Sequence, residues 1–353
     1  MFMQSNTLHN VVACQGGDIT ALEQRPVPKV GDGEILLKLR VVGFCGTDLF
    51  KLNTGSAAVG TVLGHELVGE VIAIGDGVDG FEVGNRVAVP HHVPCGECVV
   101  CRRGNETMCE TFRENLMEPG GFADTVLIRP RAVEFAAHVL PDHVSDEAAV
   151  FVEPAACVLR GVERSGITSE GTAVVLGGGS MGLLHLLVLR AALPGVKVVV
   201  IDPVAERRDL ARELWAAEAT APGDAALAAV QSLTEGTGAD AVFDTVGGNR
   251  TLQAGLDLSR QGGSIVLFAH AGEGERADFD LNDLFKYERR ILGTYSGAVK
   301  EQVGIFELIT SGALDPTPLV THSMPLNEFQ KGVDLVRQQK ALKVLFTPSR
   351  ESS

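Results

Sequence analysis

Four of the seven cysteines lie close together in the sequence, in a spacing typical of a metal site. They are Cys95, Cys98, Cys101 and Cys109, which form the pattern C-x2-C-x2-C-x7-C. Four thiolates suit a closed tetrahedral Zn²⁺ site, which can hold an irregular loop together. An iron–sulfur cluster also takes four thiolates, although its usual spacings differ. We therefore expect a structural zinc with no open coordination position, and no chemistry at this site.

A glycine-rich segment after a short apolar run predicts a phosphate-binding loop. The segment G-G-G-S-M-G consists of Gly177, Gly178, Gly179, Ser180, Met181 and Gly182. Gly177 permits a tight turn, Gly179 lets the backbone approach a pyrophosphate, and Gly182 allows close packing of helix on sheet. The N–H groups at the start of the helix would bind the phosphates.

Asp202 lies twenty residues after Gly182, at the end of the next apolar run. A carboxylate there can accept hydrogen bonds from the adenosine ribose and would repel a 2′-phosphate, which favours NAD over NADP. Arg207 or Arg208 either contacts the ribose or belongs to a solvated helix face. The alternative is a glycine turn in another α/β fold, with Asp202 capping a helix before Pro203.

Other potential metal ligands are scattered through the sequence. Cys45, His65, Glu66 and Glu153 each have an ordinary structural explanation when taken singly, because lone cysteines are usually buried and lone histidines are often packing residues. Their spacing alone does not show that they meet. Cys14 and Cys157 are expected to be packing residues.

The apolar runs place these residues in two kinds of structure. Up to about residue 150, short β-rich segments alternate with Gly-rich turns, and helical periodicity is scarce. From about residue 155, strands alternate with helices, which predicts a parallel sheet with helices on both faces. The expected strands are 35–42, 67–74, 86–89, 172–176, 197–201, 240–244, 264–268, 290–295, one around Leu319, and 343–347. The expected helices are 180–192, 203–215, 301–311 and 326–339.

Length and charge limit the class of protein. The 353 residues are enough for about two domains of ~150 residues each. A net charge of −15 argues against sequence-independent binding of nucleic acid. No apolar run approaches ~18 residues, so we expect no membrane span. Residues 1–10 do not resemble a signal peptide, so we expect a cytoplasmic protein with reduced thiols.

Taken in order, the motifs resemble those of the zinc-dependent medium-chain dehydrogenase/reductase superfamily, and within it the polyol (sorbitol-like) dehydrogenases. They are G-F-C-G-T-D at 43–48, G-H-E-L-V-G-E-V at 64–71, V-G-N-R-V at 83–87, the four-cysteine loop, V-E-P at 152–154, and G-G-G-S-M-G with Asp202. The resemblance implies an α/β protein with two domains. Residues 1–155 and 299–353 would form a GroES-like β-rich catalytic domain, and 156–298 a Rossmann domain, a doubly wound parallel sheet that binds NAD.

The resemblance also implies a second, catalytic zinc. Cys45 and His65 would be ligands, Glu66 would be a ligand in some states and displaced by substrate in others, and Glu153 would bind directly or through a water. Mixed ligation with one exchangeable position suits a catalytic zinc. The Thr47 hydroxyl would receive the proton of the alcohol.

Some positions depart from the family pattern or are expected only to line the pocket. The family often has a histidine three residues after the hydroxyl, which passes the proton to solvent; here the residue is Phe50, so the usual relay is broken. Expected pocket walls are Phe50, Phe112, Arg113 and residues 114–121. His270 and Tyr295 are expected near the nicotinamide.

The implied reaction is the reversible oxidation of a secondary alcohol (a polyol, cyclitol or sugar-like substrate) to a ketone by hydride transfer to NAD. We also expect a homodimer or homotetramer. One alternative is an amino-alcohol substrate, as in the threonine dehydrogenases. A zinc-stapled binding protein is a non-enzymatic alternative, which the acidic charge and the second metal set disfavour.

Overall fold

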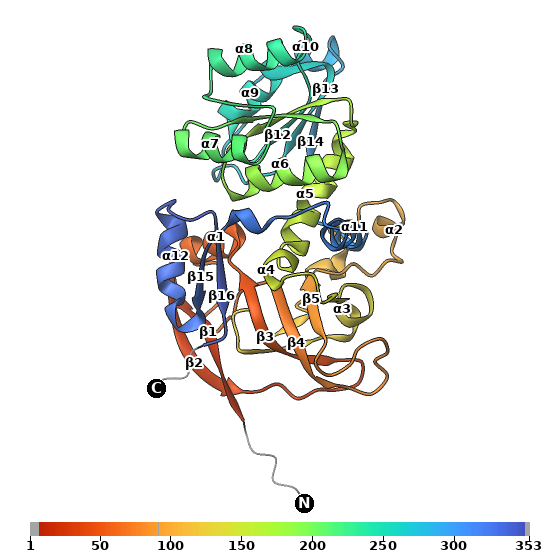
Figure 1. Ribbon diagram of the computed structural model, residues 1–353, viewed down its shortest axis with the longest axis vertical. Coiled ribbons are helices and arrows are strands. Elements are labelled where there is room, and N and C mark those ends of the chain that lie inside the picture. Colours follow the sequence, from red (N-terminus) through yellow and green to blue (C-terminus); the bar gives the residue numbers. More distant parts are fainter. Residues whose placement is uncertain (1–6, 91, 350–353) are drawn as a thin grey trace, which may run out of the picture. The chain divides into compact units, whose positions relative to one another are not determined.

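Apolar runs bounded by glycine-rich turns become short strands throughout the protein. The computed structural model describes residues 7–90 and 92–349. The chain divides into two compact units, which Figure 1 shows in ribbon form. Unit 1 consists of Met1–Glu153 and Ala298–Ser353, and unit 2 of Pro154–Gly297. Each unit is described by itself below.

Unit 1 is built on a mainly antiparallel sheet. Its strands follow the order β15-β16-β3-β4-β5-β8, with β7 also paired to β3 and β6 to β7. Only the β15–β16 pair among these is parallel. A separate hairpin joins β1 and β2. The strands are β1 (Leu8–Gly16), β2 (Ile19–Pro26), β3 (Ile35–Gly43), β4 (Glu66–Ile74), β5 (Arg86–Pro90), β6 (Met117–Glu118), β7 (Thr125–Ile128), β8 (His138–Val139), β15 (Val320–Pro325) and β16 (Lys343–Thr347).

Short helices link these strands. The α-helices are α1 (Gly46–Thr54), α2 (Val99–Arg102), α3 (Pro130–Phe135), α4 (Asp146–Ala149), α11 (Val299–Thr310) and α12 (Phe329–Arg337). The 3₁₀ turns are η1 (Glu106–Met108), η2 (Glu110–Arg113), η3 (Thr317–Leu319) and η4 (Leu326–Glu328).

Four aromatic rings pack in the core of unit 1, beside the start of α1. The ring centroids of Phe44 and Phe122 are 6.1 Å apart, and those of Phe122 and Phe329 are 4.7 Å apart. Phe346 of the last strand completes the group, with its ring 6.4 Å from that of Phe44. Because Phe44 is buried among these rings, it fixes the backbone immediately before Cys45.

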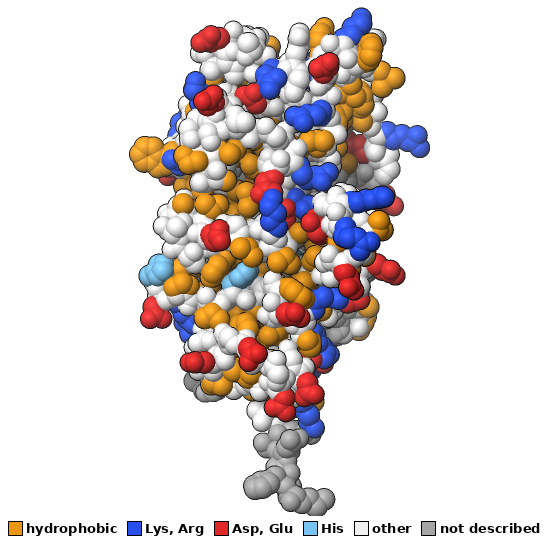
Figure 2. Space-filling view, turned by 90° about the vertical axis from the view of Figure 1, so that its right-hand side faces the viewer, with side chains coloured by type: hydrophobic (Ala, Val, Ile, Leu, Met, Phe, Trp, Pro, Cys, Tyr) orange, Lys and Arg blue, Asp and Glu red, His pale blue; other side chains and the backbone are white. Residues whose placement is uncertain are grey.

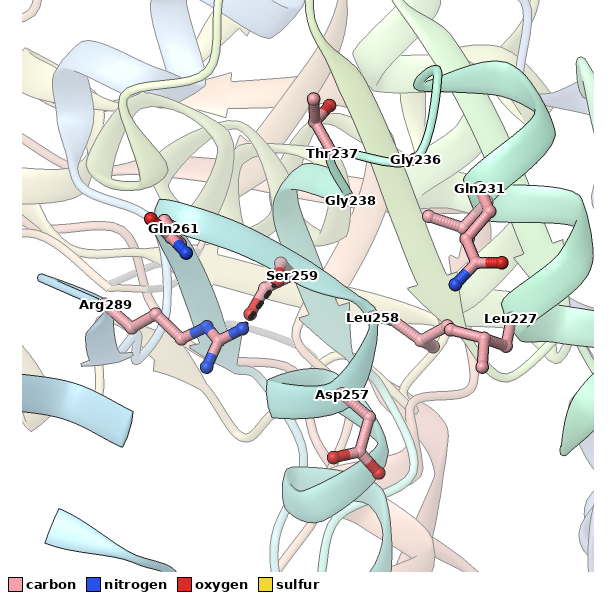
Figure 3. Close-up of a pocket in the computed structure, with 11 residues that line it drawn as sticks. Leu227, Gln231, Gly236, Thr237, Gly238, Asp257, Leu258, Ser259, Gln261 and Arg289 are labelled. Carbon is pink, nitrogen blue, oxygen red and sulfur yellow. Dashed lines mark hydrogen bonds between the residues drawn. The ribbon is translucent and has the colours of Figure 1, made fainter. Parts of the chain in front are cut away.

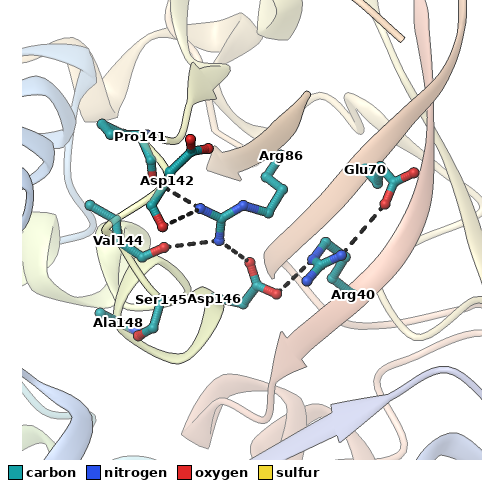
Figure 4. Close-up of polar contacts among 9 residues, drawn as sticks. All are labelled: Arg40, Glu70, Arg86, Pro141, Asp142, Val144, Ser145, Asp146 and Ala148. Atoms are coloured by element: carbon teal, nitrogen blue, oxygen red, sulfur yellow. Dashed lines mark hydrogen bonds and ion pairs between the residues drawn. The ribbon is translucent and has the colours of Figure 1, made fainter. Parts of the chain in front are cut away.

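A network of ion pairs holds residues 141–146 against the sheet (Figure 4). Arg86 on β5 donates to the carbonyl oxygens of Pro141 at 2.8 Å and Val144 at 2.9 Å. Its guanidinium group also contacts the Asp146 carboxylate at 2.9 Å, and Arg40 on β3 binds the other oxygen of Asp146 at 2.6 Å. This network ties α4 to two strands of the sheet.

Unit 2 is a parallel sheet with helices packed on it (Figure 1). The strand order β11-β10-β9-β12-β13-β14 runs outward in both directions from β9, as in a doubly wound Rossmann sheet. The strands are β9 (Thr172–Leu176), β10 (Lys197–Ile201), β11 (Glu218–Thr220), β12 (Ala239–Asp244), β13 (Ser259–Leu267) and β14 (Arg290–Gly293). The helices are α5 (Val152–Ser165), which begins in unit 1, α6 (Ser180–Ala192), α7 (Ala205–Glu213), α8 (Asp224–Leu233), α9 (Asn249–Leu258) and α10 (Leu281–Phe285).

The predicted fold class is confirmed, and a few local predictions are wrong. The helix predicted from residue 203 begins at Ala205, because an Asp202 oxygen accepts the Val204 N–H at 2.8 Å and holds Pro203 outside the helix. Leu319 lies in a 3₁₀ turn, and the strand begins at Val320. No described helix has both the length and the apolar character of a membrane span.

Candidate active site

The four clustered cysteines converge in the structure. Their sulfur atoms are 3.5 Å apart for Cys98–Cys101 and Cys109–Cys95, and 3.9 Å apart for Cys95–Cys101 and Cys98–Cys109. These separations are far longer than a disulfide bond. In a tetrahedral Zn–S₄ site with Zn–S bonds of about 2.3 Å, the sulfur atoms lie about 3.8 Å apart. The donor set therefore fits a closed zinc site.

The backbone around this four-cysteine cluster favours thiolates. The N–H of Cys95 donates to the Cys109 sulfur at 3.4 Å, and the N–H of Cys98 donates to the Cys95 sulfur at 3.4 Å. Burial raises the pKa of Cys109, but the Cys95 N–H and hydrogen bonds from Thr111 outweigh that effect and lower the pKa to about 6. These donors stabilise the deprotonated ligand that zinc requires.

The cluster packs against Phe112, which in turn contacts His92, a residue that sequence reasoning missed. Phe112, expected as a pocket wall, is fully buried and packs against the cysteines. Its ring centroid is 4.7 Å from that of His92. Burial, followed by the nearby charges of His65, Lys51 and Arg113, lowers the pKa of His92 to about 3. His92 therefore links the four-cysteine cluster to the surroundings of His65, and its ring is neutral at neutral pH.

A second group of potential metal ligands forms where β3, β4 and α1 meet. Cys45, His65 and Glu66 each offer a ligand atom, and these atoms all lie within 4.8 Å of one another. Cys45 is the N-cap of α1, and its sulfur accepts the Thr47 N–H at 3.5 Å. A helix N-terminus stabilises negative charge, so it suits a thiolate ligand.

Asp48, on the first turn of α1, contacts both Cys45 and His65 and so orients these two candidate ligands. It is fully buried, and its carboxylate accepts the Cys45 N–H at 3.1 Å. The other oxygen lies 3.4 Å from Nδ1 of His65 and also accepts the Gly64 N–H. A carboxylate at Nδ1 fixes the tautomer and leaves Nε2 available for a metal.

Glu66 has a partner that sequence reasoning also missed. Its Oε2 forms an ion pair with Nζ of Lys343, the first residue of the last strand. Its Oε1 is buried and has no hydrogen-bond partner. A buried carboxylate oxygen without a partner is costly, and this carboxylate belongs to the group that contains a thiol and an imidazole. This orphaned oxygen is the observation in favour of a metal at Cys45, His65 and Glu66.

The other residues predicted for this site lie around it. Glu153 is the second residue of α5 and is not a member of the three-ligand group, although its charge acts on Lys343. Thr47 is exposed on the first turn of α1. Phe50, on the same helix, is 48% exposed, so it is available as a pocket wall, and Arg113 is exposed as well.

The glycine-rich loop has the geometry expected of a phosphate-binding turn. Gly177 has φ of 99°, which an L side chain rarely adopts. A Cβ on Gly182 would lie 1.8 Å from the carbonyl oxygen of Gly177, so only glycine allows α6 to start here. A Cβ on Gly179 would meet nothing within 4 Å. The space beside Gly179 is therefore free for a phosphate, next to a helix N-terminus without a side-chain cap.

Asp202 lies at the carboxyl end of β10 and is held by the backbone on both sides. Its Oδ2 accepts the Gly178 N–H at 2.7 Å, and Oδ1 accepts the Val204 N–H. Nη1 of Arg207 lies 3.5 Å from Oδ2, whereas Arg208 donates to the carbonyl oxygens of Asp202 and Pro203. The structure thus joins Asp202 and Arg207 to the glycine loop and gives Arg208 a structural role.

A pocket of about 210 Å³ lies in unit 2 away from all of these residues (Figure 3). Arg289, Gln261, Asp257 and Gln231 project around it. It adjoins the first residues of β12 and β13, whereas Gly177 and Asp202 follow the last residues of β9 and β10. In parallel sheets the cofactor binds at the carboxyl ends, so this pocket is not the dinucleotide site. His270 and Tyr295, both exposed, follow the carboxyl ends of β13 and β14.

On the face of the molecule in Figure 2, basic and acidic side chains are interspersed and form no continuous basic surface. Together with the net charge of −15, this distribution gives no electrostatic support to a nucleic-acid interface.

Comparison with known proteins finds matches to both parts of the chain. The model of the alcohol dehydrogenase GroES-like domain matches residues 31–138, and that of the zinc-binding dehydrogenase matches residues 169–311. An erythritol/L-threitol dehydrogenase of Mycolicibacterium smegmatis is 33% identical over 360 residues, which cover 96% of this chain and 97% of that protein. An L-threonine 3-dehydrogenase of Yersinia pseudotuberculosis is 31% identical over 332 residues, covering 91% of this chain and 94% of that protein.

Among solved structures, the alcohol dehydrogenase TADH from Thermus sp. ATN1 is similar along nearly the whole chain. Its TM-score is 0.83 at 27% sequence identity, and the match covers 96% of this chain and 99% of that one.

Proposed function

This chain belongs to the zinc-dependent medium-chain dehydrogenase/reductase superfamily, and we propose that it reversibly oxidises a secondary hydroxyl of a small polyol to a ketone with NAD as the hydride acceptor. Membership of this family makes the chain an NAD(P)-dependent zinc alcohol dehydrogenase. The substrate class, the choice of NAD, the ligand roles and two zinc ions per chain are the proposal.

The observation that carries the proposal is the group formed by Cys45, His65 and Glu66, in which one oxygen of the Glu66 carboxylate is buried without a hydrogen-bond partner. A thiolate, an imidazole and a carboxylate that is already shared with Lys343 give mixed ligation with one weak position. When bound there, zinc supplies Lewis-acid stabilisation of the alkoxide that forms as the alcohol loses its proton.

The residues of the chain have separate tasks in this proposal. Asp48 holds His65 in the tautomer that presents Nε2, and the N-terminus of α1 supports the charge of Cys45. Thr47, exposed beside them, accepts the proton from the alcohol and releases it to water, because Phe50 provides no imidazole for a relay. Glu153, at the start of α5, would bind the zinc through a water, because it lies outside the three-ligand group while its charge acts on Lys343.

NAD is favoured by the position of Asp202. Because its carboxylate is fixed by Gly178 and Val204, it presents a rigid negative charge beside the phosphate loop. That charge repels a 2′-phosphate. In Asp202→Ser, which keeps a hydrogen-bond acceptor for the loop, Arg207 would be released to bind the phosphate. We expect the NADP-to-NAD ratio of kcat/KM to rise at least about tenfold.

An amino-alcohol substrate is the second candidate, because a relative that is 31% identical carries the name L-threonine 3-dehydrogenase. Arg113 is exposed and acts electrostatically on His92, so its guanidinium group is available to bind a substrate carboxylate. A polyol would need no such partner. The two candidates therefore differ in their dependence on Arg113.

The test is a kinetic screen that follows reduced nicotinamide with NAD and NADP, using erythritol, L-threitol, a cyclitol, a simple secondary alcohol and L-threonine. We expect at least about tenfold higher kcat/KM for a polyol than for L-threonine, and loss of turnover in Cys45→Ser with NADH binding retained. A preference for L-threonine that is lost in Arg113→Gln would support the second candidate. Turnover in Cys45→Ser, or none of any alcohol by the wild type, would refute both.

A further inference from the structure

Lys343 and Glu66 lie on strands that are separated by a third strand. In the order β16-β3-β4, Gly43 at the end of β3 pairs with Glu66 on one side and with Leu345 on the other. Residues opposite each other in a sheet share a face, and Lys343 is two residues from Leu345, so all of these residues point to the same face. The lysine side chain reaches across β3 to meet the carboxylate.

Gly43 makes this crossing possible. A Cβ at this position would lie 2.2 Å from Oε2 of Glu66 and 2.9 Å from Cε of Lys343. Neither distance is tolerated between atoms that are not bonded. The central strand therefore leaves a gap in its side chains, and the ion pair fills that gap.

Both partners of the ion pair are buried. Lys343 is 4% exposed and Glu66 is 1% exposed. Nζ of Lys343 also lies 5.5 Å from the ring centroid of Phe151. A buried ion pair is strongly coupled, because water does not screen it. Glu66 thus has Oε2 on a buried ammonium group and Oε1 buried without a hydrogen-bond partner, while its carboxylate belongs to the ligand group with Cys45 and His65.

We propose that Lys343 is a positioning residue, whose ammonium group competes with zinc for the Glu66 carboxylate and keeps that carboxylate a weak, exchangeable ligand. The inference rests on the proposed zinc site. Outer partners of metal ligands alter both the orientation and the donor strength of those ligands. A carboxylate shared with an ammonium group donates less charge to the metal, so the metal keeps a position for the substrate oxygen.

Charge balance gives the direction of the effect. Lys343 forms its ion pair with Glu66, and the charge of Glu153 also acts on it. Without the lysine, Glu66 would have zinc as its cationic partner. We therefore expect the loss of Lys343 to tighten the binding of zinc while hindering the entry of substrate. If Lys343 served only to stabilise the fold, its loss would weaken the binding of zinc or leave it unchanged.

The test compares wild type with Lys343→Met, after mild chelation of the more accessible zinc and titration with Zn²⁺ or Co²⁺. We expect a zinc dissociation constant about tenfold lower in the variant, weaker cobalt ligand-field absorption from a higher coordination number, and a reduced kcat. Weaker zinc binding, or an unchanged affinity and spectrum, would overturn the proposal. If Lys343→Met does not fold, Lys343→Gln gives the same comparison.

A double-mutant cycle checks that the effect passes through Glu66. In the Glu66→Gln background, Lys343→Met should change zinc affinity less than about twofold, because the amide has no charge to release. An undiminished effect would contradict the assigned role. Lys343→Arg, which keeps the charge, should restore the cobalt spectrum of the wild type, and failure to do so would contradict it too.

Cys45→Ser separates this inference from the proposed function. The thiolate-to-cobalt charge-transfer band of the wild type should disappear in Cys45→Ser. If the wild type lacks that band, the proposed zinc site fails and the inference fails with it. If the band is present but does not respond to Lys343→Met, only the inference fails.

Discussion

At the scale of single residues, the candidate site depends on partners that lie outside its motifs. Asp48 belongs to the same hexapeptide as Cys45, yet nothing in the sequence separates an orienting carboxylate from a helix cap; the structure shows that it is both. Lys343 follows Glu66 by 277 residues. No spacing rule joins residues that are so far apart, so the motifs indicated candidate ligands but not the side chains that contact them.

The buried His185 on α6 makes stability depend on pH. Its Nδ1 lies 2.7 Å from the Met181 carbonyl oxygen, and its ring is 4.5 Å from that of Phe268. Burial lowers its pKa to about 4, against the weaker effect of the Met181 hydrogen bond. An unfolded histidine has a pKa of about 6.5. Between that pH and about pH 4, His185 is therefore protonated in the unfolded chain and neutral in the folded chain. Stability is therefore lost as the pH falls from about 6.5 to about 4.

We expect the free energy of unfolding to fall more between pH 7 and pH 5 in the wild type than in His185→Gln, by roughly 2 kcal/mol. Urea denaturation at the two pH values measures the difference. The comparison at pH 7 serves as the control, because there it reports the packing cost of the substitution alone. An equal difference at both pH values would show that His185 does not titrate as described.

At the scale of elements, the parallel sheet was the part most open to prediction. The runs 172–176 and 197–201 coincide with β9 and β10, because a short, fully buried strand is a continuous apolar run bounded by turns. The hairpin of β1 and β2 was not predicted. The β2 strand is largely exposed and polar, so it has no apolar pattern. Helix α1 was also missed, since its start is set by the cap at Cys45 rather than by periodicity.

The segment between β8 and α4 depends on one side chain of the network in Figure 4. Arg86 is 20% exposed and binds Asp146 together with the carbonyl oxygens of Pro141 and Val144. We expect Arg86→Met to lower the free energy of unfolding by about 2–4 kcal/mol, because two carbonyl oxygens and one oxygen of the largely buried Asp146 carboxylate lose their donor. Denaturation, together with faster hydrogen exchange at residues 140–146, would show this.

Arg40→Met is the matched control for this network. Arg40 binds the same Asp146 but is 39% exposed, so its loss should cost less than about 1 kcal/mol. An Arg86→Met variant no less stable than Arg40→Met would mean that the segment is held by its other contacts.

At the scale of the whole molecule, both metal clusters lie in unit 1 and the dinucleotide loop lies in unit 2. The two clusters differ in the number and strength of the ligands with which a chelator would compete. The four-cysteine cluster encloses its metal with four thiolates, whereas the Cys45 cluster has three candidate ligands, one of which is shared with Lys343. A metal with fewer and weaker ligands leaves first. We therefore expect two zinc ions per chain that are lost in sequence under increasing chelator strength.

Loss of the first zinc should abolish turnover and leave both the melting temperature and NADH binding nearly unchanged, because the glycine loop and Asp202 belong to the other unit. Loss of the second should lower the melting temperature by several degrees, since the loop that carries Phe112 would lose its core. Metal analysis alongside thermal melts measures both steps. Cys45→Ser and Cys98→Ser should each retain one zinc, and only Cys98→Ser should melt early. If both zinc ions left at the same chelator strength, the two sites would hold their metals equally tightly. That result would contradict the division between an open site at Cys45 and a closed four-cysteine site.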